Sequence, residues 1–253
     1  IEVLKKVSLI AAEDTRKTAV FLNHYQISVP MISYHKFNEK QRTDEIISRI
    51  QKNESVAIVS DAGTPGISDP SSIIIKAAIT VGITVCCLPG PTAFVPALVM
   101  SGLSTENFFF AGFLPDKLKQ KNELIDLIKT LPFTLIFYEA PHRLVKTIQF
   151  LYEHLGNRKC AAIKEISKLF ESVYRGTLED FSQTENIDLR GEFVLIVEGK
   201  TSEVIDDEKL IRICQTELNS GLNKRQIIDK VCRDYSLPKN RVYQIVLNLF
   251  EST

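Results

Sequence analysis

Apolar runs rich in β-branched residues alternate with amphipathic helical patterns through the first hundred residues, and this alternation limits the possible folds more than any other feature. The runs cover residues 7–12, 55–60 and 83–88, and the helical patterns cover residues 15–24, 40–51, 71–81 and 92–101. Strands separated by helices of this length favour a largely parallel sheet. The sequence therefore predicts an α/β domain over residues 1–113, which ends where a strand beginning at Phe108 meets a Gly/Pro break.

A second group of elements follows that break and the charged run at residues 116–121. Strands are predicted at residues 133–138, 159–166, 171–176 and 192–198, with helices at residues 120–129, from Pro141 and near Leu178. They indicate a second α/β domain over residues 114–200. From residue 201 to 253 the pattern is helical alone, with helices at residues 208–219, 223–235 and 238–250, and the last two have the spacing of a helix-turn-helix pair.

The composition is that of a globular protein without a global positive field. Lys and Arg number 31, and Asp and Glu also number 31, so any surface for nucleic acid must come from local clustering. The five cysteines form no C-x-x-C pair, which favours a reducing compartment. Every apolar run is shorter than the ~18 residues of a membrane span, and no signal peptide precedes the first element, so we expect a cytoplasmic protein without a membrane partner.

Local positive charge gathers in the helical tail. Six basic residues and two acidic ones lie between Lys224 and Arg241, which gives this stretch a net charge of +4. Phosphate contacts are expected there first, from Lys224, Arg225, Lys239 and Arg241. The solvated face of a small structural bundle explains the same charges equally well.

Two glycine-rich loops follow predicted strands of the first domain and precede helices. The first is VSDAGTPGISDP, residues 59–70, and the second is LPGPTA, residues 88–93. In open α/β sheets, ligands bind beyond the carboxyl ends of the strands, and glycine lets the backbone approach a ligand closely. Neither loop has the G-x-G-x-x-G or P-loop pattern, so the usual nucleotide sites lose their support. A turn-rich connection without a ligand is the alternative.

Two further loops in the second domain carry side chains suited to acid–base work. One holds Glu139, His142 and Arg143 after a strand, and the other holds Lys164 and Glu165 at a strand end. A carboxylate beside an imidazole or a guanidinium can move a proton or bind a phosphate. Helix capping by Glu139 and a hairpin with cross-strand charge pairs are the structural alternatives.

Other chemistries lack the residues that they need. The four histidines show neither H-x-x-x-H nor Cys/His spacing, so no metal site is predicted. A nucleophilic triad is also unsupported, because the chain has no G-x-S-x-G motif and its adjacent cysteines lie in an apolar run.

Six stretches taken together resemble the tetrapyrrole methylase superfamily. They are IAAEDTR (residues 10–16), SDAGTPGISDP (60–70), LPGPTA (88–93), GFLP (112–115), TLIFYEAPHRL (134–144) and GEFVLIVEG (191–199), in order across nearly the whole chain. The resemblance implies two α/β domains with S-adenosylmethionine between them, a homodimer, and no metal. The branch that the chain resembles most methylates the 2′-hydroxyl of a cytidine ribose in small-subunit (16S) ribosomal RNA, with the helical tail helping to dock that RNA.

The resemblance also implies which residues contact the cofactor. On the first-domain side they would be Asp61, Ala62, Gly63, Pro89, Gly90, Thr92 and Ala93, and on the second-domain side Phe137, Tyr138, Gly191 and Glu192. For the reaction itself, a ribose hydroxyl is a poor nucleophile and needs a group that takes its proton. Glu139 and Glu165 are the candidate bases, and the groups expected to steer ribose or phosphate are His142, Arg143 and Lys164.

One departure from the family pattern concerns the start of the chain. Ile1-Glu2-Val3-Leu4 has the pattern of the inside of an amphipathic helix, whereas family members begin with an upstream strand and a Pro/Gly-rich loop. We expect that this first strand and loop are missing from the sequence. Two rival functions remain open: carbon methylation of a tetrapyrrole (or a relative acting on a modified protein residue), and a non-catalytic RNA-binding assembly factor on the same fold.

Overall fold

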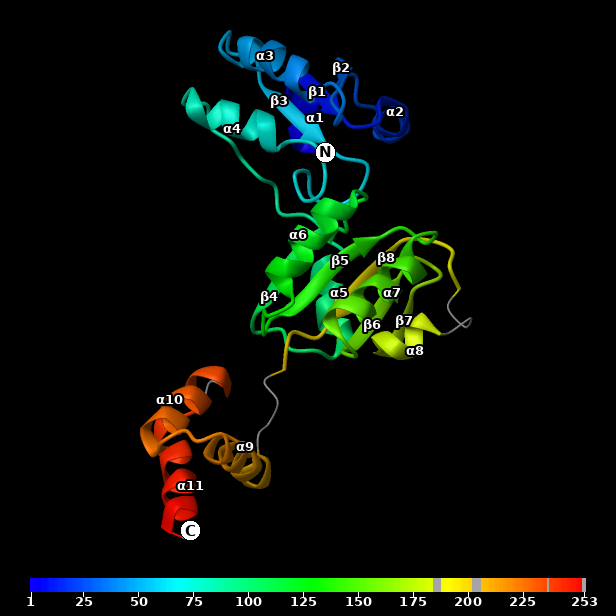
Figure 1. Cartoon of the computed structure of the whole chain (residues 1–253). Helices are drawn as coiled ribbons and strands as arrows, with labels where there is room; N and C mark the ends of the chain where they lie inside the picture. Colours follow the sequence, from blue (N-terminus) through cyan, green and yellow to red (C-terminus); the bar gives the residue numbers. More distant parts are fainter. Residues whose placement is uncertain (184–187, 202–205, 236, 252–253) are drawn as a thin grey trace. The chain divides into compact units, whose positions relative to one another are not determined.

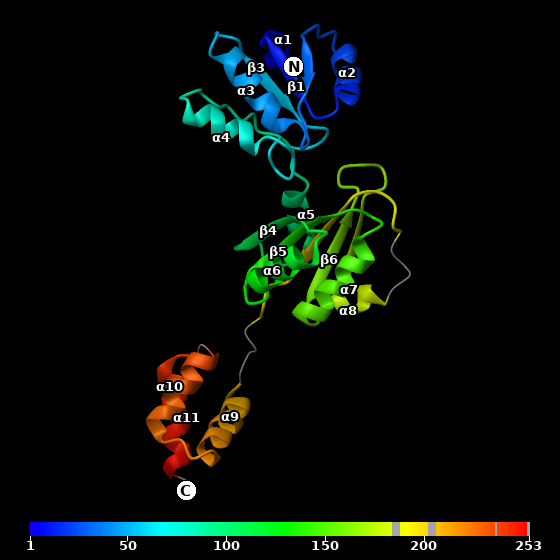
Figure 2. The same cartoon turned by 45° about the horizontal axis from the view of Figure 1, so that its top comes forward.

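The computed structural model describes residues 1–183, 188–201, 206–235 and 237–251, and it divides into two compact units. The first unit comprises Ile1–Lys129 and Phe133–Glu198, and it contains a three-stranded and a five-stranded sheet (Figures 1 and 2). The second unit comprises Thr130–Pro132 and Gly199–Thr253 and contains helices. The expected mixed α/β class with a helical tail is confirmed.

The three-stranded sheet is parallel, with the strand order β2-β1-β3. Its strands are β1 (Leu9–Ala12), β2 (Met31–Ser33) and β3 (Val56–Val59). All four residues of β1 are buried, because this strand is paired on both sides and covered on both faces. The predicted parallel arrangement of the strands near residues 7–12 and 55–60 is therefore confirmed.

Helices cover both faces of this sheet. They are α1 (Glu2–Lys6), α2 (Thr15–His24), α3 (Glu39–Ile50) and α4 (Ser72–Thr80). Ile10 and Ala12 pack with Leu22 of α2, whereas Ala11 packs with Ile46 of α3 and Ile74 of α4. Successive strand side chains point to opposite faces, so α2 covers one face and α3 and α4 cover the other, as Figure 1 shows.

The strand predicted at residues 83–88 is wrong. This segment runs without regular structure, and Val85 and Leu88 are exposed. Its β-branched composition suits a strand, but a strand forms only where a neighbour completes the ladder, and no described strand pairs with it. Conversely, the three-residue strand β2 was not predicted, because so short a segment shows no alternation.

The five-stranded sheet is mostly antiparallel, in the order β4-β5-β8-β6-β7. Its strands are β4 (Phe108–Phe113), β5 (Thr134–Glu139), β6 (Lys159–Lys164), β7 (Ser172–Thr177) and β8 (Phe193–Val197). Only β4 and β5 pair in parallel. β8, the last of them in the chain, lies between β5 and β6, and all five of its residues are buried.

Helix α5 (Phe94–Ser101) packs on this second sheet. Its Ala97 and Leu98 share a core with Ile136, Ala161 and Ile196. The other helices of this part are α6 (Leu118–Ile128), α7 (Leu144–Leu155) and α8 (Leu178–Ser182). Thus β4 is a strand of the five-stranded sheet and α5 packs on that sheet, although both precede residue 114. The three-part division of the chain stays a prediction.

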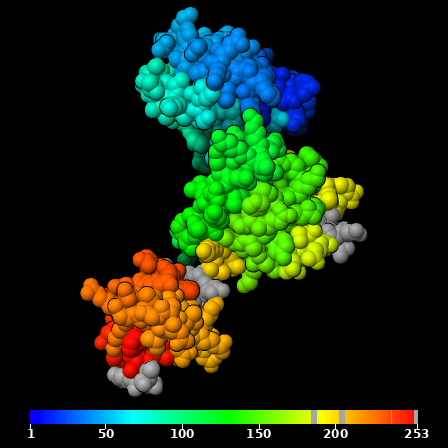
Figure 3. Space-filling view, viewed as in Figure 1, coloured from blue at the N-terminus to red at the C-terminus, as the bar shows by residue number. Residues whose placement is uncertain are grey.

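The second unit is a bundle of α9 (Asp207–Asn219), α10 (Lys224–Tyr235) and α11 (Lys239–Glu251), seen in orange to red in Figure 3. Buried apolar residues from all three helices form its core, and they are Leu210, Cys214, Ile227, Ile228, Val231, Val242 and Val246. Residues 202–205, 236 and 252–253 of the predicted tail lie outside the described residues. Within the described ranges, no helix is long and apolar enough to cross a membrane.

Candidate functional site

The three parallel strands of the first sheet end at one edge, and the glycine-rich loop of residues 60–71 starts there. Backbone hydrogen bonds fix this edge, from the Glu13 N–H to the Val59 carbonyl (3.0 Å) and from the Tyr34 N–H to the Ala12 carbonyl (2.7 Å). The Asp61 N–H donates to the Glu13 carboxylate at 3.1 Å. The loop after β3 is therefore tied to the end of β1, at the place where α/β sheets bind ligands.

Three carboxylates gather at this edge with one lysine. The Lys17 ammonium lies 2.6 Å from the Asp61 carboxylate. Burial raises the pKa of Asp69 to about 6, and the negative charges of Glu13 and Asp61 add to the shift, against an opposing hydrogen bond from Ser60. A carboxyl group held at such a pKa is typical of functional sites, because it can take up or release a proton near neutral pH.

The second glycine-rich loop lies against the first. The Thr64 hydroxyl donates to the Pro91 carbonyl at 3.1 Å. Gly63 has a φ of +74°, and a Cβ atom there would lie 3.6 Å from the same carbonyl oxygen, while a Cβ at Gly90 would lie 3.4 Å from the Thr64 hydroxyl. Glycine is thus needed at Gly63 for the backbone conformation, and the two loops form one surface.

Most predicted cofactor contacts of the first domain lie on this surface. Thr92 is half-buried, and the exposed residues are Asp61, Ala62, Gly63, Pro89, Gly90 and Ala93. Hereafter the term loop cluster denotes residues 60–71 and 88–93 together with Glu13 and Lys17.

Tyr138, at the end of β5, joins the loop cluster to the second sheet. Burial raises the pKa of its hydroxyl and the nearby charge of Asp69 adds to this, whereas the backbone N–H groups of Phe94 and Ala93 act against the shift. The neighbouring Phe137 is fully buried in the sheet core. Because strand side chains alternate, only Tyr138 of this predicted pair presents its side chain to the loop cluster.

The ends of β5 and β6 and the start of β8 meet at one edge of the second sheet, where Phe193 pairs with both Glu139 and Lys164. Within this edge, Glu139 is fully buried and both its oxygens are occupied. One accepts from the Ala140 N–H (2.9 Å) and lies 3.1 Å from the Arg143 guanidinium, and the other accepts from the Thr147 hydroxyl (2.6 Å). Glu139 therefore ties the turn before α7 to the helix through the Arg143 and Thr147 side chains, but it does not cap α7, whose N-cap residue is Arg143.

Arg143 is also engaged by the protein. It donates to the Leu114 carbonyl at 2.5 Å and pairs with Asp116 at 2.9 Å, in addition to Glu139. These three contacts favour a structural role over the predicted contact with RNA. His142, one residue earlier, is exposed in the turn that precedes α7.

The predicted base Glu165 is locked to the loop that precedes β8. Its carboxylate accepts from the Glu192 N–H at 2.8 Å, and the Lys168 ammonium lies 3.0 Å from both Glu165 and Glu192. The Glu192 N–H and then Lys168 lower the pKa of Glu165. Gly191 has a φ of +87°, and a Cβ there would lie 2.6 Å from the Glu165 carboxylate. Glu165 is therefore a weakened base.

Lys164, Asp188 and Arg190 form a second ion-pair group beside it. The buried Lys164 ammonium lies 2.5 Å from Asp188, which also pairs with Arg190 at 2.8 Å. Arg190 and then Lys164 lower the pKa of Asp188. Lys164 is thus held by a carboxylate rather than directed at a substrate, and that carboxylate comes from the segment before β8 and not from the opposite strand of the β6–β7 hairpin, where Lys164 faces Ser172.

Sequence reasoning missed Glu13, Lys17 and Asp69 as members of the site. Two of them stand inside motifs that were recognised, Glu13 in IAAEDTR and Asp69 in SDAGTPGISDP. The contact between Glu13 and Asp61 joins residues 48 positions apart, so periodicity along the chain could not reveal it.

The basic residues predicted to bind RNA in the tail have partners within the bundle. Arg241 lies 2.7 Å from Asp207, and Lys239 and Arg225 lie 3.6 and 3.9 Å from Asp229. Lys224 lies over the rings of Tyr243 and Phe250, at 5.9 Å from each ring centroid. All of these ion pairs are exposed, and exposed pairs contribute little energy, so the cations can exchange partners.

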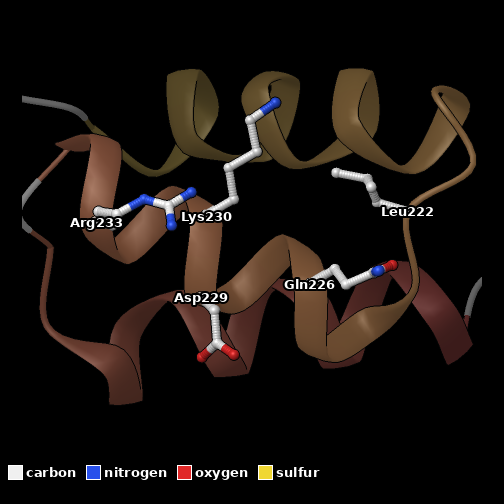
Figure 4. A pocket seen from close by; sticks show the side chains of 5 residues that line it. All are labelled: Leu222, Gln226, Asp229, Lys230 and Arg233. Atoms are coloured by element: carbon white, nitrogen blue, oxygen red, sulfur yellow. The ribbon is translucent and has the colours of Figure 1, made fainter.

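A hollow of about 300 Å³ lies on the same bundle, lined by Leu222, Gln226, Asp229, Lys230 and Arg233 (Figure 4). Figure 4 shows Lys230 pointing toward α9, where it meets Glu217 at 2.7 Å, and Asp229 pointing toward α11. Two of the charged side chains that line the hollow, Asp229 and Lys230, are thus paired with residues of the other helices. In the described part of the chain, no group of three or more His, Cys, Asp or Glu side chains could hold a metal ion.

Comparison with known proteins places this arrangement in a family. Residues 1–182 match the model of the tetrapyrrole (corrin/porphyrin) methylases. A Synechocystis protein named ribosomal RNA small subunit methyltransferase I is 39% identical over 98% of this chain and 91% of its own length. A Bacillus subtilis protein of the same name is 39% identical over 96% of this chain and 86% of its own length.

Solved structures agree in fold. Diphthine synthase superposes with a TM-score of 0.62 at 14% identity, over 79% of this chain and 82% of its own. The methyltransferase CobJ superposes with a TM-score of 0.57 at 19% identity, over 78% of this chain and 85% of its own. At these identities the likeness shows the fold alone.

Asp69→Asn is expected to stabilise the protein near pH 7.5 and to have little effect near pH 4. The folded pKa of about 6 exceeds the ordinary value of 3.8, so the folded protein binds more protons between these pH values. Wild-type stability therefore falls as pH rises through this window, and asparagine removes the fall, by about 1 kcal/mol after allowance for solvent screening. Urea unfolding at both pH values measures the difference.

The control for this comparison is Asp44→Asn, at an exposed aspartate on α3. It should leave the stability unchanged at both pH values. If the difference in unfolding free energy between wild type and Asp69→Asn were the same at both pH values, the pKa of Asp69 would not be raised in the folded protein.

Proposed function

The chain belongs to the tetrapyrrole (corrin/porphyrin) methylase family, and we propose that it transfers a methyl group from S-adenosylmethionine to the 2′-hydroxyl of a cytidine ribose in small-subunit (16S) ribosomal RNA. Family membership makes the chain an S-adenosylmethionine-dependent methyltransferase. The proposal of an RNA substrate is supported by the 39% identity, over nearly the full chain, to proteins named for small-subunit ribosomal RNA.

The rival functions have less support. A tetrapyrrole substrate would rest on structures such as CobJ, whose 19% identity speaks for the fold and not for the substrate. A non-catalytic assembly factor would have no use for a half-buried carboxyl with a raised pKa at the loop cluster, because such a group costs stability. The loop cluster therefore favours a catalytic chain.

The loop cluster suits S-adenosylmethionine in shape and charge. Its glycines leave open backbone where side chains would intrude, and its carboxylates Glu13, Asp61 and Asp69 outnumber the single Lys17. This excess negative charge complements a sulfonium cation. When bound, the cofactor supplies an electrophilic methyl group.

The residues of the chain would position the reactants and take up a proton. Methyl transfer needs the attacking oxygen, the methyl carbon and the leaving sulfur nearly in line, which a rigid site supplies by positioning. Among the carboxylates, we assign the proton to Asp69, because Glu139 and Glu165 are held by backbone N–H donors and cationic side chains. The exposed His142 would steer the ribose or the phosphate, with Lys164 supporting the same edge from within.

A homodimer belongs to the same proposal. On α5, Val95 and Val99 are four residues apart and are 49% and 69% exposed, so they share an apolar face that another surface could cover. A second copy of the chain is the occupant that the resemblance implies.

The proposal is tested by incubating the purified protein with labelled S-adenosylmethionine and small-subunit particles from cells that lack the corresponding gene. Digestion of the RNA to nucleosides and mass spectrometry should then reveal 2′-O-methylcytidine. Label in a base or in no RNA nucleoside would contradict the proposed reaction, and label in an added porphyrin precursor would favour the rival enzyme.

Gly63→Val is expected to abolish binding of S-adenosylmethionine, because the branched side chain would fill the surface shared by the two loops and would strain a backbone at φ +74°. Isothermal calorimetry measures the affinity. Gly156→Val is the control for the strain, since Gly156 has φ +77° and no neighbour within 4 Å of a Cβ atom. Equal affinity in a folded Gly63→Val protein would remove the loop cluster from the cofactor site.

Replacing Lys224, Arg225, Lys239 and Arg241 together by alanine is expected to weaken RNA binding without changing the affinity for S-adenosylmethionine. Each lost phosphate contact should also flatten the logarithmic salt dependence by roughly 0.7–0.9. Binding to small-subunit RNA at several salt concentrations measures both effects. An unchanged slope in the folded variant would leave these residues as the surface of a structural bundle.

A further inference from the structure

The turn between β2 and α3 presents an aromatic ring to solvent at the carboxyl edge of the first sheet. The Phe37 side chain is 93% exposed, which is unusual for a phenylalanine, while the nearby Tyr34 is buried. The turn directly follows β2, so it lies at the same edge of the parallel sheet as the loop after β3. Between β2 and β3 there are two strand spacings, or roughly 10 Å.

The backbone of this turn is held in place from several sides. The Asn38 side chain accepts from the His35 N–H at 2.8 Å and donates to the Ser33 hydroxyl at 3.1 Å. The Asn38 and Glu39 N–H groups both donate to the His35 carbonyl at 2.9 Å. These hydrogen bonds fix the backbone of the turn without any contribution from the Phe37 ring. The fold therefore does not need this ring for packing.

The His35 ring supports Phe37 from one side. The two rings meet edge to face with centroids 6.1 Å apart, and the Phe37 N–H donates to the His35 imidazole at 3.3 Å. The opposite surface of the Phe37 ring is open, as its exposure requires. A ring with an open face on a fixed turn suits a stacking base, because the backbone that carries the ring needs no ordering when the base binds.

Positive charge accompanies the ring. Lys36 and Lys40 are exposed, and neither has an ion-pair partner in the part of the chain that the structure describes. Glu39 is half-buried, and Arg42 is paired with Glu45 on α3. An aromatic ring between lysines without partners is the combination by which proteins hold single-stranded nucleic acid.

The other strongly exposed phenylalanine provides a contrast. Phe170 is 69% exposed in the turn between β6 and β7. Its surroundings are acidic, with Glu171 next to it, and Lys168 is already bound to Glu165 and Glu192. Of the two most exposed phenylalanines in the described ranges, only Phe37 combines its exposure with positive charge that has no ion-pair partner there.

We propose that the turn from Tyr34 to Asn38 is a docking site for single-stranded RNA, in which an unpaired base stacks on Phe37 and the neighbouring phosphates contact Lys36 and Lys40. The site rests on the proposed RNA substrate and adds to it a contact outside the loop cluster and outside the helical tail. It would hold the strand at the edge where the methyl acceptor must lie.

The test measures fluorescence anisotropy of a labelled oligocytidylate with the full chain and its Phe37 variants. Phe37→Ala should weaken binding about 5- to 150-fold, the loss expected for one stacked base. Phe37→Trp should keep wild-type affinity, whereas Phe37→Leu should lose it although leucine is equally apolar. Lys36→Ala should flatten the salt dependence by about 0.7.

Matched variants distinguish base stacking on Phe37 from a general effect of removing an exposed ring. Phe170→Ala should bind as wild type does, and the affinity for S-adenosylmethionine should be the same in all variants. The proposal would be overturned if Phe37→Ala bound RNA as tightly as wild type, or if Phe37→Leu kept the wild-type RNA affinity. It would also be overturned if Phe170→Ala lost as much RNA affinity as Phe37→Ala. Loss of dimerisation in Phe37→Ala, seen by light scattering, would instead make this ring a contact between copies.

Failure of the site and failure of the proposed function give different results. If wild type methylates small-subunit RNA and Phe37→Ala does so with unchanged KM, the docking site is wrong and the function stands. If wild type neither binds oligocytidylate nor methylates the particle, both are wrong.

Discussion

The pairing of β8 with β5 on one side and β6 on the other is the interaction on which the larger sheet depends. β8 is the last strand in the described residues, yet it fills the centre of the sheet, and its five residues are buried. Until it inserts, β5 and β6 have no ladder partner between them, and the apolar side chains that α5 covers have no continuous surface. The sheet therefore forms from contacts distant in sequence, and distant pairing makes folding slow.

The same insertion brings the charged groups of the second sheet together. The segment that enters β8 carries Glu192, whose N–H binds Glu165, and the ends of β5 and β6 hold Glu139 and Lys164 beside it. Each of these groups has hydrogen-bond or ionic partners within the fold. Buried charges require such partners, because desolvation without them is costly. This edge is thus rigid and electrostatically satisfied.

The edge of the first sheet is different. Glu13, Asp61 and Asp69 lie close together with one lysine, and the pKa of Asp69 is raised first by burial and then by the negative charges of its neighbours. A protein that holds a carboxyl group in such surroundings gains a group able to change its protonation near neutral pH. The second edge has partners for all of these charged groups, whereas the first edge holds a carboxyl group with a raised pKa. This contrast is the physical ground on which we propose the cofactor site and proton transfer at the loop cluster.

The sequence by itself determined the elements and the loops. Apolar periodicity located α2 at residues 15–24 and the strands near residues 9, 56, 134 and 193, because local pattern reflects which face is buried. It also located the glycine-rich loops, since Gly63 needs a positive φ. Only the tertiary structure decided that residues 83–88 form no strand, that β4 joins the second sheet, and that Glu139 and Arg143 bind each other. These outcomes depend on which groups meet across the fold. Strand partners, ion pairs and the surroundings of Asp69 are contacts between distant residues, which local pattern does not encode.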